Sequence, residues 1–172
     1  MSERPTLVFY HPKPTGNGAA LSVKLHPARI GLNSGYIFVA LAPQKCVASR
    51  SGVVTFPKFK WEEAIMMSLD FVECAKVLQV FHGEKESLED GKGLFHKTVE
   101  HNAVFELRHV IDPVEGYQIT ARVFKSGNDA KDEDRMVAFF LTSAEALGLK
   151  LAIERSMASL AFGVEEKVEV ER

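Results

Sequence analysis

Alternating hydrophobic and polar positions predict that much of this chain folds as short β-strands. Four such runs lie in the first 70 residues, at 6–10, 19–26, 35–41 and 61–69. Successive side chains of a strand point to opposite faces, so one face of each run is expected to be buried. In 19–26 the odd positions are apolar, and the even positions are small or polar. Four further runs follow at 93–99, 103–111, 117–124 and 135–141.

Two amphipathic helices each follow one set of four strands. Asp70 and Glu73 have the spacing of a capping box, and apolar residues then recur at helical intervals up to Gly83. Thr142 and Glu145 repeat this spacing and open a longer helix that is expected to run to about residue 162. The order is therefore ββββα–ββββα, with capping boxes at matching points. A tandem duplication of one unit explains this order.

This order predicts an α+β fold in which two antiparallel four-stranded sheets pack together with two helices. Neither sheet can bury its apolar face alone, and packing the two sheets against each other removes both faces from water. We expect residues 1–163 to form a single domain. The acidic segment 164–172 is expected to be a solvated C-terminal tail.

Length and composition fit one ordinary domain. The chain has 172 residues and a mass of 19.1 kDa, with 46% hydrophobic and 26% charged residues, which argues against disorder. Its two cysteines cannot build a disulfide framework. The sequence contains neither a stretch of about 18 apolar residues nor a segment resembling a signal peptide. A cytoplasmic location is therefore expected.

Charge is distributed unevenly along the chain. Residues 1–61 contain eight Lys or Arg and one Glu, a net of +7, whereas the remaining 111 residues contain 13 Lys or Arg and 22 Asp or Glu, a net of −9. A basic half of this kind is typical of a protein with one surface that meets a polyanion. The alternative is that folding mixes the two halves and cancels the asymmetry.

The even positions of two strands combine cations with aromatic rings. If the apolar positions face the core, Lys24, His26, Tyr36 and Phe38 share the opposite face. Rings on which bases stack and lysines that neutralise phosphates are typical of single-strand binding proteins. Alternatively, the rings pack against a second subunit and the lysines protect strand edges. Further candidate cations lie in the flanking loops and on the second set of strands: Lys13, Arg29, Lys45, Arg50, Lys58, Lys60, Arg108 and Arg122.

Several fragments, in order along 8–163, resemble the Whirly proteins, which bind single-stranded DNA in plant organelles. The family motif Lys-Gly-Lys-Ala-Ala-Leu corresponds here to Gly16-Asn17-Gly18-Ala19-Ala20-Leu21. The other similar fragments are Leu41-Ala42-Pro43, Phe59-Lys60-Trp61-Glu62, Leu94-Phe95-His96 and Thr142-Ser143-Ala144-Glu145. The resemblance implies the same ββββα–ββββα fold, a homotetramer assembled through the helices, and contacts with nucleic acid from the motif turn, where Asn17 lies. The related kinetoplastid mitochondrial RNA-binding proteins share the fold and bind guide RNA.

We predict that the chain is an oligomeric, non-catalytic protein that binds single-stranded nucleic acid. It is expected to show little sequence preference and to bind DNA more tightly than RNA. Both motif lysines are replaced by glycine, so the alternative is an assembly module that has lost binding, although Lys13 and Lys24 lie near enough to substitute electrostatically. A small-molecule enzyme with a pocket around His96 or His109 is a third hypothesis. The histidines and cysteines lack zinc spacing, and no nucleophile or dinucleotide motif occurs, so we expect no catalytic residues, metal or cofactor. Trp61 is expected to be a core or interface anchor.

Overall fold

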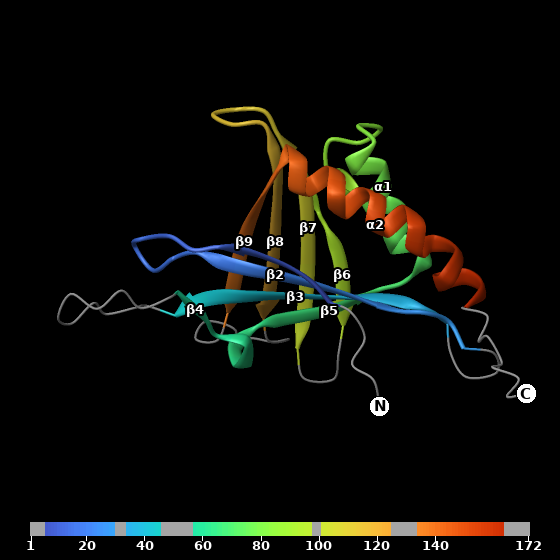
Figure 1. Cartoon of the computed structure of the whole chain (residues 1–172), viewed down its shortest axis with the longest axis horizontal. Coiled ribbons are helices and arrows are strands. Elements are labelled where there is room, and N and C mark those ends of the chain that lie inside the picture. The colour runs from blue at the N-terminus through green and yellow to red at the C-terminus, as the bar shows by residue number, and fades with distance from the viewer. Residues whose placement is uncertain (1–5, 30–33, 46–56, 98–100, 125–133, 164–172) are drawn as a thin grey trace, which may run out of the picture.

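Two antiparallel β-sheets cross each other, and two helices lie together on one side of them in the computed structural model of the chain (Figure 1). The structure describes residues 6–29, 34–45, 57–97, 101–124 and 134–163. The predicted tail 164–172 and the candidate Arg50 lie outside these residues. The predicted α+β architecture, with two packed antiparallel sheets and two helices, is confirmed.

The first sheet is a meander in the order β1-β2-β3-β5. Its strands are β1 (Thr6–His11), β2 (Ala19–His26), β3 (Tyr36–Lys45) and β5 (Ile65–Leu69). A two-residue strand that the pattern did not predict, β4 (Lys58–Phe59), pairs with the end of β3. The predicted strand 61–69 begins later than expected, because Trp61–Glu63 form a 3-10 turn, η1. This turn breaks the alternation that had placed Trp61 with the core, and its side chain is exposed. The core placement of Trp61 was therefore wrong.

The second sheet has the same order as the first, β6-β7-β8-β9. Its strands are β6 (Leu94–Lys97), β7 (Asn102–Val110), β8 (Gly116–Phe124) and β9 (Arg135–Thr142). A short 3-10 segment, η2 (Leu88–Gly91), lies in the polar loop before β6. The shared order of the two sheets is what a duplicated unit predicts.

Both helices begin at the predicted capping boxes. Asp70 caps α1 (Phe71–Phe81), and Thr142 caps α2 (Ser143–Phe162). In each box the cap side chain accepts a hydrogen bond from the backbone N–H of the glutamate three residues later, and that glutamate accepts one from the cap backbone. α2 ends at Gly163, whose positive φ of 78° suits glycine. No helix within the described residues is long and apolar enough to span a membrane.

One core joins the inward faces of both sheets and both helices. Odd-numbered residues of β2, β3 and β5 meet odd-numbered residues of β7, β8 and β9, as the alternation predicted. The helices pack on each other and close one side of this core. The members with almost no exposed surface include Leu21, Leu41, Ile65, Leu107, Ile119, Phe139, Leu141 and Leu160.

Burial of one face of the first sheet makes a specific stability prediction. Leu41 on β3 is 1% exposed in the core, whereas Met66 on the neighbouring β5 is 58% exposed on the opposite face. We expect Leu41→Ala to lower the free energy of unfolding by about 2–5 kcal/mol, because it leaves a cavity in a packed core. Met66→Ala should change it by less than about 0.5 kcal/mol. Urea denaturation of both variants measures this, and equal effects would contradict the assignment of the two faces.

Cys74 gives a second prediction. Its side chain is buried at the start of α1, and its Sγ donates a weak hydrogen bond of 3.6 Å to the Leu69 carbonyl. Burial, together with the nearby Asp70 and Glu73 carboxylates, raises the pKa of the Cys74 thiol to about 12. Only about one molecule in 10,000 then carries the reactive thiolate at pH 8.

The experiment uses a Cys46→Ser variant, which leaves Cys74 as its one thiol. Folded protein at pH 8 should resist a thiol reagent such as 5,5′-dithiobis(2-nitrobenzoate), and the same protein in denaturant should react at once. Rapid labelling of the folded variant would show that Cys74 is accessible.

Candidate nucleic-acid interface

The even positions of β2 and β3 form a surface on the side of the first sheet that faces away from the core. Lys24 lies opposite Phe38 in the strand register, and His26 lies opposite Tyr36. The rings of His26 and Tyr36 stack with a centroid distance of 4.5 Å and an interplanar angle of 8°, and His26 meets Phe38 edge-on at 6.3 Å. These four side chains are half-buried. The structure therefore brings them together on one surface, as the alternation predicted.

A second group of rings lies toward the other end of the same face. Tyr10 on β1 and Phe59 on β4 have ring centroids 5.4 Å apart. Phe38 and Phe59 both pack on a small apolar floor made by Ala40, Ala42 and Ala64. The face thus has aromatic side chains at both ends, with small residues between them. We call this surface, with its bordering lysines, the outer face of the first sheet.

The candidate cations are divided between the two ends of the first sheet. Lys24 lies beside the His26–Tyr36 stack, and the exposed Arg29 follows β2. At the other end, Lys45 of β3 lies opposite Lys58 of β4 in the strand register, and Lys60 follows the end of β4. Seven residues separate Phe38 from Lys45 along β3, which is about 23 Å of strand. The two groups of cations therefore lie at opposite ends of the first sheet. Lys45 and Lys58 have the opposite parity to Gln44 and Phe59, so alternation directs their side chains to the other side of the strands.

The turn between β1 and β2 is held beside the lysine-rich end by Gln44. Its Oε1 accepts hydrogen bonds from the backbone N–H groups of Lys13, at 2.7 Å, and Gly18, at 3.0 Å. The Gln44 backbone N–H in turn donates to the Gly18 carbonyl at 2.9 Å. Lys13 and Asn17, both in this turn, are thereby brought near Lys45 and the strand β4.

The two glycines that replace the motif lysines are required by this turn. Gly16 has a positive φ of 77°, a backbone conformation that favours glycine. A Cβ on Gly18 would clash with the His11 carbonyl oxygen, the Gln44 side chain and the Lys13 backbone nitrogen. Lysine at either position would therefore strain or rebuild the turn, so the loss of the motif is coupled to the local backbone.

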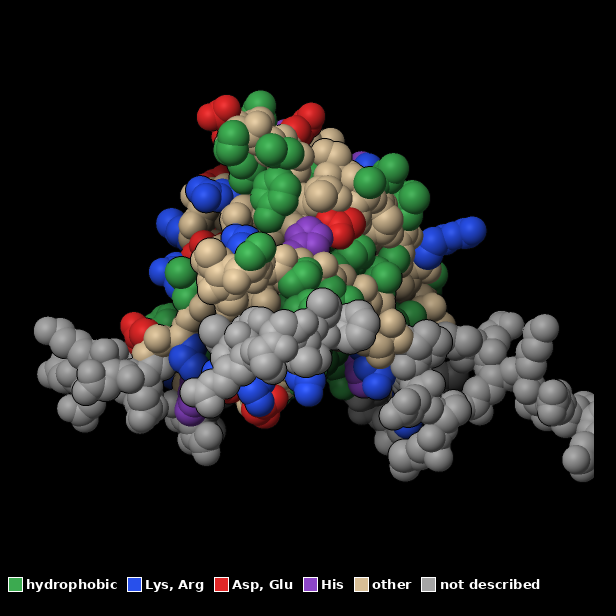
Figure 2. Space-filling view, turned by 60° about the vertical axis from the view of Figure 1, so that its left-hand side comes forward, with side chains coloured by type: hydrophobic (Ala, Val, Ile, Leu, Met, Phe, Trp, Pro, Cys, Tyr) green, Lys and Arg blue, Asp and Glu red, His purple; other side chains and the backbone are tan. Residues whose placement is uncertain are grey.

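Carboxylates are absent from the strands of the first sheet. None of its five strands contains an Asp or Glu. Lys60 is paired with Glu63 of η1 at 2.9 Å. Within the described part of the chain, no ion pair involves Lys13, Lys24, Lys45 or Lys58. In Figure 2, Lys and Arg side chains gather along the lower margin of the molecule, where the first sheet lies in Figure 1.

Arg108 and Arg122 lie apart from this surface. Both are on the outward side of the second sheet, where Arg122 forms an ion pair with Glu106. Phe95 and Phe124 lie on the same side, with ring centroids 6.4 Å apart. Of the predicted contact residues that the structure describes, ten therefore lie at the first sheet and two at the second, and Arg50 lies outside the described residues.

Sequence reasoning missed three residues of the outer face. Tyr10 shares its position parity with other outward residues, so a stricter analysis of β1 could have included it. Phe59 reaches the face only because β4 pairs with the end of β3. Gln44 acts through hydrogen bonds to a turn 26 to 31 residues earlier. No local pattern indicates either of these long-range contacts.

A metal site and an enzyme pocket near His96 or His109 are the other sites considered from the sequence. The described residues contain no group of three or more His, Cys, Asp or Glu that could hold a metal ion. His96 and His109 each face one glutamate, Glu73 and Glu115 respectively. A groove of about 440 Å³ on the second sheet is lined mainly by its outward residues and by η2, and neither histidine lines it.

Comparisons with known proteins agree with this architecture at the level of structure. No family model and no curated protein matches the sequence. WHY1 from Arabidopsis thaliana superposes with a TM-score of 0.67 and 20% identity, covering 94% of each chain. WHY3 from the same plant gives 0.70 and 20%, covering 94% of this chain and 92% of its own. MRP1/MRP2 of Trypanosoma bruciei gives 0.59 and 13%, covering 94% of this chain and 96% of its own.

These similarities extend over nearly the whole chain, although few residues are identical. They agree with the predicted α+β architecture, and WHY1 and WHY3 are Whirly proteins, the family that the sequence resembles. The protein therefore has the Whirly-type fold.

Proposed function

We propose that this protein binds single-stranded nucleic acid, DNA in preference to RNA, on the outer face of its first sheet and without catalysis. One observation carries the proposal: Lys24, His26, Tyr36 and Phe38 lie together on strands that contain no carboxylate. The resemblance to Whirly proteins supports the same function.

Stacking supplies the preference for unpaired strands. Every base has a flat π-face, and duplex DNA hides these faces inside the helix, so only single strands can stack on exposed rings. Tyr36 and Phe38 are the stacking residues in this proposal. Their positions are fixed, because Tyr36 is already stacked on His26 and Phe38 packs on the alanine floor. Little sequence preference follows, since stacking is largely independent of base identity.

Phosphate contacts supply most of the affinity. The unpaired Lys13, Lys24, Lys45 and Lys58 need break no ion pair with the described residues before they meet a phosphate. Asn17, Arg29 and Lys60 border the same face. Arg108 and Arg122 belong to the outward side of the second sheet, where they would meet a different stretch of strand.

The active form is proposed to be a cytoplasmic homotetramer assembled through the helices. α2 leaves Leu147 and Leu151 about half exposed in the single chain, and α1 exposes Phe71 and Val72. Apolar residues on the free side of two adjoining helices are suited to burial between subunits. We further propose that residues 1–163 act as one domain, with 164–172 as an acidic tail.

The second candidate function is an assembly module without nucleic-acid binding. The observation that favours it is the pair of glycines at positions 16 and 18, which leaves the motif turn with one lysine, Lys13. A tetramer with no affinity for oligonucleotides would support this alternative.

Fluorescence anisotropy with labelled oligonucleotides tests the proposal directly. Matched single-stranded DNA, single-stranded RNA and duplex DNA are titrated with the full chain at 50 mM and 200 mM salt. We expect tighter binding to single strands than to duplex, and weaker binding at the higher salt. Equal affinity for duplex, or no response to salt, would contradict it.

Removing either stacking ring should weaken binding. We expect Tyr36→Ala and Phe38→Ala each to cost about 1–3 kcal/mol of binding free energy, which is roughly a 5- to 150-fold rise in Kd. The matched control is Phe162→Ala, which removes an aromatic ring that is 85% exposed at the end of α2. If all three variants bind alike, the rings on the first sheet do not stack on bases.

Replacing one phosphate-contacting lysine should reduce the salt dependence. For single strands, log K falls with log salt with a slope of about −0.7 for each phosphate neutralised. Lys24→Gln should therefore make the slope less steep by about 0.7 and leave thermal stability almost unchanged. Lys92→Gln, an exposed lysine next to η2, is the control and should keep the full slope. An unchanged slope for Lys24→Gln would remove this residue from the interface.

A further inference from the structure

The glutamate of each capping box makes one contact beyond its own helix. Glu145 accepts a hydrogen bond at Oε2 from the Thr142 backbone N–H at 2.9 Å, and its Oε1 lies 2.8 Å from Nε2 of His11 on β1. A carboxylate has no proton to donate at neutral pH, so the imidazole is the donor. The His11 ring also stacks on Phe139, with centroids 4.5 Å apart.

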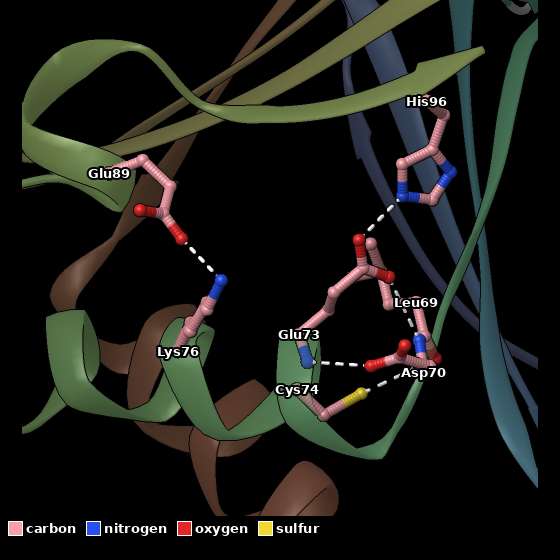
Figure 3. A network of polar contacts seen from close by, with 7 residues as sticks. All are labelled: Leu69, Asp70, Glu73, Cys74, Lys76, Glu89 and His96. Carbon is pink, nitrogen blue, oxygen red and sulfur yellow. Dashed lines mark hydrogen bonds and ion pairs between the residues drawn. The ribbon is translucent and has the colours of Figure 1, made fainter.

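The other capping box has the same arrangement. Glu73 accepts a hydrogen bond at Oε2 from the Asp70 backbone N–H at 3.0 Å, and its Oε1 lies 2.7 Å from Nε2 of His96 on β6 (Figure 3). Both pairs are largely shielded, with side-chain exposures of 30% and 26% for His11 and Glu145, and of 25% and 19% for His96 and Glu73.

The two contacts are exchanged between the two halves of the chain, each made of one set of strands and the helix that follows it. His11 lies on the first strand of the first half and bonds the helix of the second half. His96 lies on the first strand of the second half and bonds the helix of the first half. Each pair thus joins a helix N-terminus to the opposite sheet. Separating the two halves would break both pairs.

Few other charged groups face these pairs. The Asp70 side chain caps α1 beside Glu73, and it accepts the Glu73 backbone N–H at 2.8 Å. Lys76, one turn along α1, is paired with Glu89 instead. At the other pair, His11 stacks on the Phe139 ring of β9 and lies opposite Ala19 of β2 in register, and Glu145 also accepts a hydrogen bond from the Thr142 hydroxyl.

We propose that His11–Glu145 and His96–Glu73 form a reciprocal proton-sensitive clamp that holds the two halves of the fold together most strongly in mildly acidic solution. A protonated imidazole and an ionised carboxylate attract each other more strongly than a neutral imidazole and the same carboxylate. The clamp is strongest where the imidazole is protonated and the carboxylate is ionised.

The direction of the pH effect follows from each partner. An imidazole that gains a partner stabilises the fold when it is protonated, and this contribution is lost as the pH rises. The carboxylate contributes when it is ionised. Burial by itself raises the pKa of Glu145, but hydrogen bonds from Thr142 and His11 outweigh burial and leave this pKa below its usual value. The contribution of Glu145 is therefore retained until the pH falls through that lowered value.

Thermal unfolding of the full chain, at one protein concentration and at pH 5.5 and pH 8.5, tests the clamp. His11→Gln and His96→Gln keep a side-chain N–H donor but cannot become charged. We expect the Tm difference between the wild type and each variant to be larger at pH 5.5 than at pH 8.5, by about 2–4 °C. Loss of the His11–Phe139 stacking affects both pH values and cancels in this comparison.

His109→Gln is the matched control, because His109 faces Glu115 at 3.5 Å within the β7–β8 hairpin and joins no separate halves. Because its contact is longer and Glu115 is 68% exposed, its Tm difference should depend less on pH than those of His11→Gln and His96→Gln. When His11→Gln is made in a Glu145→Gln background, the additional loss of Tm at pH 5.5 should disappear, which would show that the two residues are coupled. If the His11 and His96 variants show no greater pH dependence than the control, the clamp is refuted. If one variant fails to fold, the other still decides.

Discussion

Burial of one apolar face from each of two crossed sheets is the interaction on which the rest of this structure depends. A sheet with one apolar face is stable only when that face is covered. Residues such as Leu41 and Phe139 meet between the sheets, and the helices close the side that remains. Because strand side chains alternate, commitment of the odd positions of β2 and β3 to this core directs the even positions outward.

The outer face of the first sheet is therefore a consequence of core packing. Lys24 and Phe38 lie opposite each other because the register that aligns Val23 with Val39 in the core also aligns their neighbours. A shift of register by one residue would move the rings into the core and the valines into solvent. The stability of the core and the geometry of the candidate interface are thus set by the same strand pairing.

The repeated order of strands and helix gives the fold its second organising feature. Two units with the same strand order each end in a capped helix, and the capping glutamates Glu73 and Glu145 bond histidines of the opposite unit. The units also differ. The strands of the first sheet carry no carboxylate, whereas Glu106 neutralises Arg122 on the second. On the first sheet, Lys24 has no ion pair among the described residues and lies beside the stacked rings of His26 and Tyr36, and the proposed binding surface is therefore placed there.

The sequence by itself determined the strands, both capped helices, the two-sheet architecture and the shared face of Lys24, His26, Tyr36 and Phe38. Each follows from local periodicity or from a cap motif within four residues. Tertiary structure decided that Phe59 joins the outer face, that Gln44 holds the turn at Gly18, that Trp61 leaves the core, and that His11 and His96 pair with capping glutamates. Three of these depend on contacts between segments far apart in the chain. The fourth depends on a 3-10 turn that interrupts the strand period. The alternation of hydrophobic and polar residues within one strand encodes neither the long-range contacts nor the turn.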